Sequence, residues 1–338
     1  NYESRCALRV LKVVDEFEAE DEISLYDNVL KFPWENLIDS NKTIAVHAVL
    51  NKSKMSHSHF VALKVKDAVV DRFRSLGGTR PSVDVERPDL RIQVHIHKSR
   101  CTLLLDSSGE SLHKRGYRRI QGEAPINEVL AAGMLMLSGW DGEQTLLDPM
   151  CGSGTILCEA VMLARKIPPG YFLNFYGFLR WKDFDEKLWE RIRQDADRKI
   201  HPLRAKVFGN DVNQRTLFAA SENIAAAGLQ DDITLKQVAF ENSSPPDPQG
   251  GFILTNPPYG ERIKKADMLS FYSMIGDVLK SKYTGYTAWL ITSDIGGLHS
   301  VGLRASKKLT LFNGPLECKF VKYEMYQGSK KQRKQQNE

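Results

Sequence analysis

Strand and helix patterns largely alternate in the C-terminal half of the chain, and this alternation limits the folds that the sequence can adopt. Short apolar stretches end at glycines or prolines and lead into helical patterns. Strands are predicted at residues 145–148, 206–211, 233–240, 252–255 and 286–292, and helices at 155–166, 214–227 and 266–280. This pattern favours a parallel sheet that is covered on both faces.

The end of this region departs from the alternation. Two strand patterns, at 307–312 and 319–326, flank Asn313-Gly314-Pro315, so the sheet should finish with an antiparallel hairpin. We therefore expect an α/β fold, a Rossmann-like sheet over residues 124–326, which begins with a helix at 125–138. Residues 327–338 are polar and basic, and we expect a disordered tail.

A smaller α/β domain is predicted over residues 1–106. Its strand patterns lie at 43–50, 90–97 and 101–106, and a helical pattern lies at 59–76. The acidic run near the start is interpreted as a solvated face. Because the first residue, Asn1, is not a methionine, we also expect that an N-terminal piece is missing.

Composition excludes several classes of protein. The 338 residues are 42% hydrophobic and 26% charged, which is typical of a globular chain, and the formal net charge of +5 permits a nucleic-acid partner without requiring one. The odd number of cysteines, five, argues against a disulfide framework. No apolar run approaches the roughly 20 residues of a membrane helix, and no secretory signal is present. We interpret the chain as a cytoplasmic protein with no membrane partner.

A glycine turn at residues 148–155 joins a buried strand to an apolar helix. Gly152 and Gly154 allow the backbone to pass close to a ligand. The full dinucleotide fingerprint is absent, and no phosphate-binding lysine follows the glycines. Asp148 would suit a cationic ligand with an ammonium or sulfonium centre. The alternative is an ordinary tight turn between a strand and a helix.

Asp211 ends the next strand, where a carboxylate can accept hydrogen bonds from both hydroxyls of a ribose. It follows Asp148 by 63 residues, and we assign the extra length to an insertion at 167–198 near the mouth of the site. The alternative role for Asp211 is a helix N-cap, for which Asn213 is a rival.

Asn256-Pro257-Pro258-Tyr259 forms a rigid turn directly after a buried strand. The Asn256 side chain and the Pro257 main chain each offer a carbonyl, and two adjacent acceptors suit the two donors of a substrate amine. Tyr259 offers a ring on which a base could stack. A purely structural turn is the alternative. Cys151 has no indicated base and is interpreted as a small residue that positions the backbone.

Basic residues surround Tyr117 in the segment 107–123, which is predicted to link the two domains. RNA contacts are predicted there for the side chains of Lys114, Arg115, Tyr117, Arg118 and Arg119. Alternatively, these cations solvate a linker or pair with the acidic N-terminal run. The histidines gather in the small domain with no cysteine or carboxylate that completes a metal set, so no metal site is predicted.

The motifs resemble known families. Asp-Pro-x-x-Gly-x-Gly at 148–154 followed by Asn-Pro-Pro-Tyr at 256–259 is similar to S-adenosylmethionine-dependent amino-methyltransferases. Residues 60–68 and 91–106 resemble parts of a THUMP RNA-binding domain. Residues 109–118 and 256–262 resemble the bacterial 23S rRNA guanine-N2-methyltransferase family, and the likeness covers nearly the whole chain.

This resemblance implies S-adenosylmethionine as cofactor and RNA, either 23S rRNA or a ribosomal precursor, as partner. Relatives often carry an acid near the cofactor's adenine amine; Gln237 or backbone atoms would replace it here. Asp211 would hold the ribose. The catalytic residues that hold the target base would be Asn256, Pro257 and Tyr259. The cofactor would be lined by Asp148, Pro149, Cys151, Gly152, Gly154, Thr155 and Asn256.

Other functions remain open at this stage. A DNA adenine-N6 methyltransferase or a protein glutamine methyltransferase would use the same amine site, and the RNA-binding domain argues against both. A non-catalytic RNA-binding protein is the alternative from another class, which an intact cofactor turn disfavours. The sequence does not define the oligomeric state, although a monomer is favoured.

Overall fold

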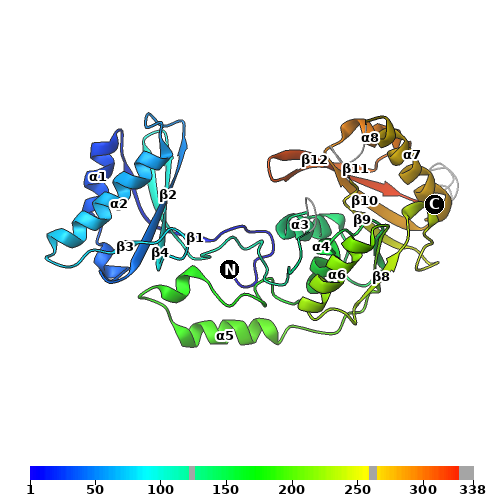
Figure 1. Cartoon of the computed structure of the whole chain (residues 1–338), viewed down its shortest axis with the longest axis horizontal. Coiled ribbons are helices and arrows are strands. Elements are labelled where there is room, and N and C mark those ends of the chain that lie inside the picture. The colour runs from blue at the N-terminus through cyan, green and yellow to red at the C-terminus, as the bar shows by residue number, and fades with distance from the viewer. Residues whose placement is uncertain (122–125, 259–264, 327–338) are drawn as a thin grey trace, which may run out of the picture. The chain divides into compact units, whose positions relative to one another are not determined.

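The structure is a computed structural model that describes residues 1–121, 126–258 and 265–326 (Figure 1). The chain divides into two compact units. The first unit contains Asn1, residues 7–112 and residues 173–194, and the second contains residues 2–6, 113–172 and 195 onward. Two short segments, 2–6 and 173–194, thus belong to a different unit from the chain around them. The predicted tail at 327–338 lies outside the described residues.

The first unit is built on a mixed sheet with the strand order β1-β5-β4-β2-β3. β4 and β5 form the predicted hairpin, in which Ile96 lies opposite Cys101. The helices bury apolar side chains such as Leu25 and Val65 in one core. The elements are β1 (Leu11–Glu18), α1 (Glu22–Lys31), η1 (Trp34–Asn36), β2 (Thr43–Asn51), α2 (Ser58–Ser75), β3 (Ser82–Val83), β4 (Leu90–His97), β5 (Arg100–Asp106) and η2 (Gly177–Arg180).

The acidic start of the chain forms two regular elements that the sequence analysis did not foresee. β1 pairs antiparallel with β5. The Asp21 carboxylate accepts a hydrogen bond from the Ser24 N–H at 2.8 Å, and the Ser24 hydroxyl accepts one from the Asp21 N–H at 3.2 Å. This reciprocal cap starts α1, since it satisfies two backbone donors that a helix end leaves unpaired.

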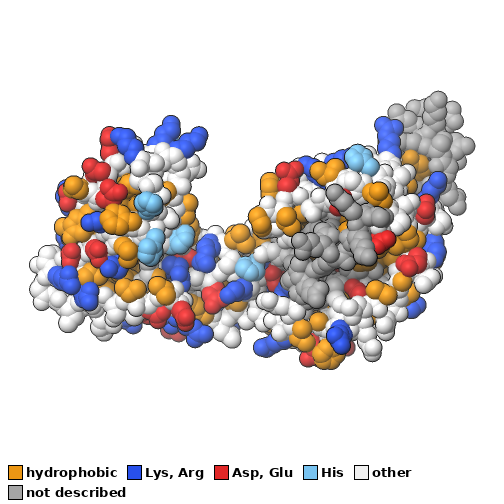
Figure 2. Space-filling model, turned by 45° about the horizontal axis from the view of Figure 1, so that its top comes forward, with side chains coloured by type: hydrophobic (Ala, Val, Ile, Leu, Met, Phe, Trp, Pro, Cys, Tyr) orange, Lys and Arg blue, Asp and Glu red, His pale blue; other side chains and the backbone are white. Residues whose placement is uncertain are grey.

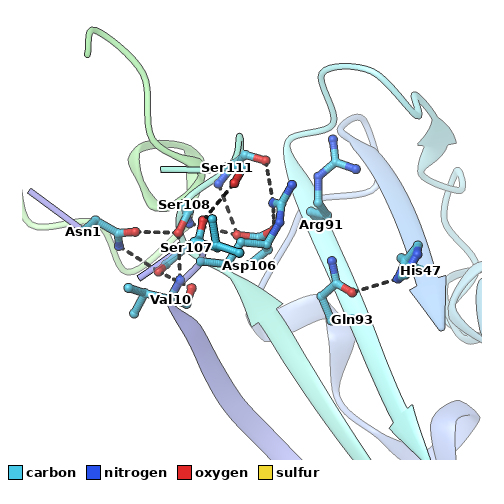
Figure 3. Close-up of polar contacts among 12 residues, drawn as sticks. Asn1, Val10, His47, Arg91, Gln93, Asp106, Ser107, Ser108 and Ser111 are labelled. Atoms are coloured by element: carbon cyan, nitrogen blue, oxygen red, sulfur yellow. Dashed lines mark hydrogen bonds and ion pairs between the residues drawn. The ribbon is translucent and has the colours of Figure 1, made fainter. Parts of the chain in front are cut away.

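Polar side chains tie the first residue and the residues just before β1 to the end of β5 (Figure 3). The Asn1 side chain donates to the Ser107 hydroxyl at 2.8 Å and accepts from the Ser108 hydroxyl at 2.6 Å. The Val10 N–H donates to the Ser108 hydroxyl at 2.8 Å. Buried Asp106 pairs with Arg9. These bonds fix the point at which β5 ends.

The second unit contains a seven-stranded sheet with the order β11-β12-β10-β9-β6-β7-β8. Pairs among β8, β7, β6, β9 and β10 are parallel, and β12 pairs antiparallel with both β10 and β11. The predicted parallel sheet with a terminal antiparallel hairpin is therefore confirmed. The elements are α3 (Glu128–Ser138), β6 (Leu146–Asp148), α4 (Thr155–Ala164), α5 (Glu186–Asp197, which begins in the first unit), β7 (Val207–Asp211), α6 (Gln214–Ala226), β8 (Ile233–Gln237), η3 (Phe240–Asn242), β9 (Gly251–Thr255), α7 (Lys265–Lys282), β10 (Tyr286–Thr292), α8 (Ile295–Ser300), β11 (Lys307–Asn313) and β12 (Leu316–Glu324).

Helices cover both faces of this sheet (Figure 1). Side chains of β10 alternate between two cores: Trp289 packs in the one that contains α3, α4 and α6, and Leu290 packs in the one that contains α7. The Trp289 and Phe320 rings stack with centroids 4.4 Å apart. Burial on both faces explains why the strands read as continuous apolar stretches.

The insertion at 167–198 is divided between the two units. Residues 173–194 belong to the first unit and residues 167–172 and 195–198 to the second, and the expected position near the mouth of the site stays a prediction. The Arg180 guanidinium donates to the Arg87 carbonyl at 2.9 Å, and Trp181 packs against the first unit's core. Aromatic residues in a glycine- and proline-rich stretch indicate that the segment packs against something. They do not indicate which part of the chain it packs against.

The predicted RNA-binding cluster is also corrected. Arg115 and Tyr117 are each 1% exposed. Arg115 Nε and the Tyr117 hydroxyl both donate to Oε1 of the buried Glu159 on α4, at 3.4 and 3.2 Å. A buried carboxylate needs such partners because it has lost its hydration. These two side chains therefore hold the fold together, and the prediction that they contact RNA is wrong.

Replacing Arg115 tests this structural role. Arg115→Ala should lower the free energy of unfolding by about 3–5 kcal/mol, because Glu159 would stay buried without its main cation. The double variant Arg115→Met with Glu159→Leu should recover most of the loss, since it removes both charges. Chemical denaturation measures both variants. A near-neutral Arg115→Ala would contradict the buried pair.

Candidate functional site

The strand order places a topological switch point between β6 and β9. From β6 the chain runs through β7 and β8 on one side, and it then crosses to β9 and β10 on the other. In open α/β sheets the ligand crevice lies at the carboxyl ends of the strands at such a point. Asp148 ends β6, and Asn256 follows β9 directly. Both predicted motifs thus meet at one edge.

A cavity of about 720 Å³ occupies this edge of the second unit. Its lining includes most of the predicted cofactor residues, namely Asp148, Pro149, Cys151, Gly152, Thr155, Asp211 and Asn256. No residue of the insertion at 167–198 is among them. Lining residues that the sequence analysis missed include Ile120, Val212, Phe240, Glu241 and Phe271.

The glycine turn has a shape that side chains would obstruct. Gly152 and Gly154 have φ angles of 56° and 81°, a region that costs other residues strain. A Cβ atom on Gly154 would lie 3.3 Å from the Cβ of Ala220 on α6. Gly154 therefore sets the close packing at the start of α4 and does not itself line the cavity.

Asp211 holds this turn from the neighbouring strand. Its carboxylate accepts hydrogen bonds from the Gly152 N–H at 3.0 Å and the Asn213 N–H at 2.9 Å. Asn213 is the N-cap of α6, because its side chain accepts from the Arg215 N–H at 2.9 Å. Asp211 is therefore not the helix cap, and its remaining acceptor capacity borders the cavity.

Asn223 on α6, which the sequence analysis did not single out, ties three segments together. Its Oδ1 accepts from the N–H groups of Arg119 and Ile120 at 2.7 and 3.0 Å. Its Nδ2 donates to the Ile120 and Ser153 carbonyls at 3.0 and 3.1 Å. The side chain is 1% exposed and uses its full set of donors and acceptors. It thus fixes the cavity wall at Ile120 against the glycine turn.

Arg118 also stabilises the glycine turn, because its guanidinium group bonds to side chains of the same unit. Its guanidinium donates to the Thr155 hydroxyl and to the Glu128 carboxylate, each at 2.8 Å. The guanidinium side chain is only 11% exposed. Most of this guanidinium is therefore engaged within the fold, and an RNA contact of Arg118 stays a prediction. Of the five predicted contacts, Lys114 and Arg119 are exposed.

Burial changes the protonation of two residues in the turn. It raises the pKa of Asp148 to about 7, with the nearby Asp211 carboxylate adding to the shift, while the nearby Thr255 side chain and a hydrogen bond from the Met150 amide oppose it. Burial also raises the pKa of the Cys151 thiol well above its ordinary value. A protonated thiol is a poor nucleophile, which agrees with a backbone-positioning role for Cys151.

Asn256 offers an acceptor to the cavity. Asn256 is one of the residues that line the cavity, and its Oδ1 is buried without a hydrogen-bond partner among the described residues. Such an atom costs free energy unless a ligand satisfies it. The adjacent Pro257 is buried. Tyr259, the third predicted residue of this motif, lies outside the described residues.

Gln237 does not border the cavity. Its Nε2 donates to the Val212 carbonyl at 3.2 Å, and the wall beyond β8 is formed by Val238, Ala239, Phe240 and Glu241. Across the described parts of the chain, no group of three or more His, Cys, Asp or Glu side chains is placed to hold a metal ion. No helix in those same parts is both long and apolar enough to span a bilayer.

Comparisons with known proteins agree with this geometry. Residues 115–322 match the family described as RMKL-like, methyltransferase domain, and residues 19–106 match the THUMP domain. A candidate RNA methyltransferase of Synechocystis sp. is 38% identical over 328 residues, which are 96% of this chain and 85% of that protein. The ribosomal RNA large subunit methyltransferase K/L of Syntrophotalea carbinolica is 40% identical over 334 residues, 95% of this chain and 47% of that protein. The chain thus spans about half the length of that relative.

A solved structure extends the comparison to three dimensions. A candidate methyltransferase complexed with SAH is 29% identical, with a TM-score of 0.85, over 96% of this chain and 87% of that one. The fold and the site together define the Rossmann-like methyltransferase class. Within it, the chain belongs to the RMKL-like methyltransferase-domain family and carries a THUMP domain in its N-terminal part.

The role of Asn223 can be tested by truncation. Asn223→Ala leaves the partly buried Arg119 and Ile120 N–H groups without their acceptor, and an unpaired group costs up to about 1–3 kcal/mol where water does not reach it. We expect a lower free energy of unfolding and faster amide hydrogen exchange at Ile120. Exposed Asn242 supplies a matched control, because Asn242→Ala should leave both quantities unchanged. Equal behaviour of the two variants would contradict the role.

Proposed function

We propose that this chain transfers a methyl group from S-adenosylmethionine to an exocyclic amine of RNA, with the N2 amine of a guanine in 23S rRNA as the target. The observation that carries the proposal is that Asn256 lines the cavity and that its buried Oδ1 has no hydrogen-bond partner among the described residues. A buried acceptor without a partner favours a ligand that brings an N–H donor. The main-chain carbonyl of the adjacent Pro257 would accept the second N–H of the same amine.

The opposite part of the cavity fits the cofactor. Asp148 is a buried carboxylate for which no ion pair is found among the described residues, so a cation from outside the chain would complete it. Asp211 keeps lone pairs for the ribose hydroxyls while it holds Gly152. These two acids and the open glycine turn are the parts of the chain that would bind the sulfonium compound. When bound, it supplies an electrophilic methyl group.

The chain's own contribution is orientation. The lone pair of an exocyclic amine is delocalised into its ring, so the amine is a poor nucleophile. Two acceptors at Asn256 and Pro257 would hold both N–H bonds and direct the lone pair toward the methyl donor. Fixed carbonyl dipoles also stabilise the positive charge that develops on nitrogen during attack. No strong base is required before attack.

An RNA substrate is supported by the THUMP domain and by the names of the relatives. The choice of guanine N2 in 23S rRNA rests on the resemblance of residues 109–118 and 256–262. An rRNA substrate implies a cytoplasmic enzyme. Lys114 and Arg119 are exposed and stay candidate phosphate contacts.

The amine site is tested by Asn256→Ala. This variant should lose methylation of in vitro transcribed 23S rRNA by at least about a hundredfold in kcat, because the lost acceptor acts mainly in the transition state. Its affinity for S-adenosylmethionine should stay within about threefold of the wild type. Radiolabelled methyl transfer and calorimetry measure the two quantities. The exposed Asn242→Ala variant is the control.

Two outcomes would count against the proposal. If Asn256→Ala methylates rRNA at the wild-type rate, Asn256 does not hold the target amine. Methyl transfer by the wild type to adenine in DNA, with none to rRNA, would favour the adenine-N6 alternative over guanine N2.

The protonation of Asp148 gives a pH prediction. Its pKa of about 7 means that the carboxyl is largely protonated at pH 6 and ionised at pH 8. A sulfonium cation prefers the ionised form, so cofactor binding lowers this pKa and releases a proton near pH 7. Affinity should therefore rise about tenfold from pH 6 to pH 8. Calorimetry in buffers of different ionisation enthalpy measures both effects. Asp148→Asn should remove the proton release, and identical titrations of the two proteins would contradict the assignment.

A further inference from the structure

A second concave site lies between α8 and the β11–β12 hairpin of the second unit. This groove has a volume of about 570 Å³. Its polar lining is basic, with His299, Arg304, Lys308 and Lys319. No acidic side chain lines it within the described parts of the chain. Elsewhere, acidic and basic side chains are interspersed over the visible face of the molecule (Figure 2).

The cations of the groove differ in their partners. Lys319 Nζ contacts the Thr310 hydroxyl at 2.9 Å and Glu317 Oε1 at 2.7 Å, so its charge is partly compensated. Arg304 and Lys308 are exposed, and no carboxylate pairs with them among residues 1–121, 126–258 and 265–326. The groove therefore presents two uncompensated cations and an imidazole at a concave surface. A ligand with several negative charges in a row matches this chemistry.

The sheet register relates the groove to the amine site. Thr255, the residue before Asn256, lies opposite Leu290 on β10. Leu290 lies opposite Val321, and Val321 lies opposite Lys308. Neighbouring strands are about 4.8 Å apart, so three steps place the Lys308 backbone about 14 Å from Thr255. Residues in one row point to the same face, so Lys308 shares with Thr255, the residue before Asn256, the face of the sheet that α7 and α8 cover.

We propose that this groove binds the phosphates of the RNA strand that carries the target nucleotide, a few nucleotides away from the base. This inference rests on the proposed function. An enzyme that modifies a base edge must take that base out of its stack, so the flanking strand is single-stranded at the site. Arg304 and Lys308 would neutralise successive phosphates of that strand, while Asn256 holds the extruded base. The groove would fix the strand's direction across the sheet without reading its sequence.

The double variant Arg304→Ala with Lys308→Ala tests the proposal in the full chain. Filter binding with a twelve-nucleotide single-stranded RNA and with 23S rRNA should show weaker affinity. The slope of log K against log salt should fall by up to about 1.4, since each single-strand phosphate contact contributes about 0.7. The KM for rRNA should rise while kcat at saturating rRNA stays within about twofold. Unchanged affinity for S-adenosylmethionine confirms that the variant is folded.

Matched variants distinguish an effect of the groove residues from an effect of the protein's net charge. Lys280→Ala with Lys307→Ala removes two exposed charges of the same unit outside the groove lining, and it should keep the wild-type slope. Arg304→Lys with Lys308→Arg should bind as the wild type does. If the groove variant behaves like the control, or if the same slope change appears only with single-stranded DNA, the proposal is wrong.

Failure of the proposed function is distinguishable from failure of the groove. Filter binding does not depend on methyl transfer, so a reduced slope together with no rRNA methylation by the wild type would uphold the groove and reject the amine assignment. Active rRNA methylation with an unchanged slope would reject the groove alone.

Discussion

Two hydrogen bonds, from the Gly152 N–H to the Asp211 carboxylate and from the Cys151 N–H to the Asn210 carbonyl, join the glycine turn to the neighbouring strand at the edge where both functional motifs meet. The turn has glycines with positive φ and little intrinsic preference for one shape. Its conformation is therefore imposed by side chains from other segments. Asn223 holds Ser153, and Arg118 holds Thr155. Asn223 is buried and the Arg118 side chain is only 11% exposed, so both partners are themselves held in place beside the turn.

The carboxylates around α4 show how the same burial gives opposite roles. Glu159 and Glu128 pair with Arg115 and Arg118, so their charges are balanced within the chain and support the fold. Asp148 is as deeply buried, yet no cation accompanies it among the described residues; burial raises its pKa to about 7 and raises the pKa of Glu159 as well, so the lack of a cation is what sets Asp148 apart. The uncompensated acid is the one that borders the cavity. Its missing partner is what a cationic cofactor would supply.

Local patterns in the sequence were enough to predict the strands and the parallel pairing of the sheet in the second unit. Apolar stretches, a glycine turn and a Pro-Pro turn predicted which strand ends meet, because parallel strands present their carboxyl ends at one edge. Contacts between distant segments were not predictable in this way. Asn223 bonds to residues 103 and 70 positions away, and nothing in its own neighbourhood signals this.

Charge patterns were the least reliable guide, because a cation in the sequence does not show whether it will be solvated or paired. Arg115 and Arg118 look like a surface cluster beside Tyr117, yet they serve carboxylates on α4 and α3. Residues 173–194 of the aromatic insertion likewise belong to the first unit, where Trp181 packs against the core.

Nucleoside mass spectrometry of ribosomal RNA tests the central claim most directly, since it reads the chemical product without any assumption about binding. Cells that lack this gene should lose N2-methylguanosine at one position of 23S rRNA, and the restored wild-type gene should return it. An unchanged content of N2-methylguanosine in 23S rRNA, or a change only in N6-methyladenine, would contradict the account.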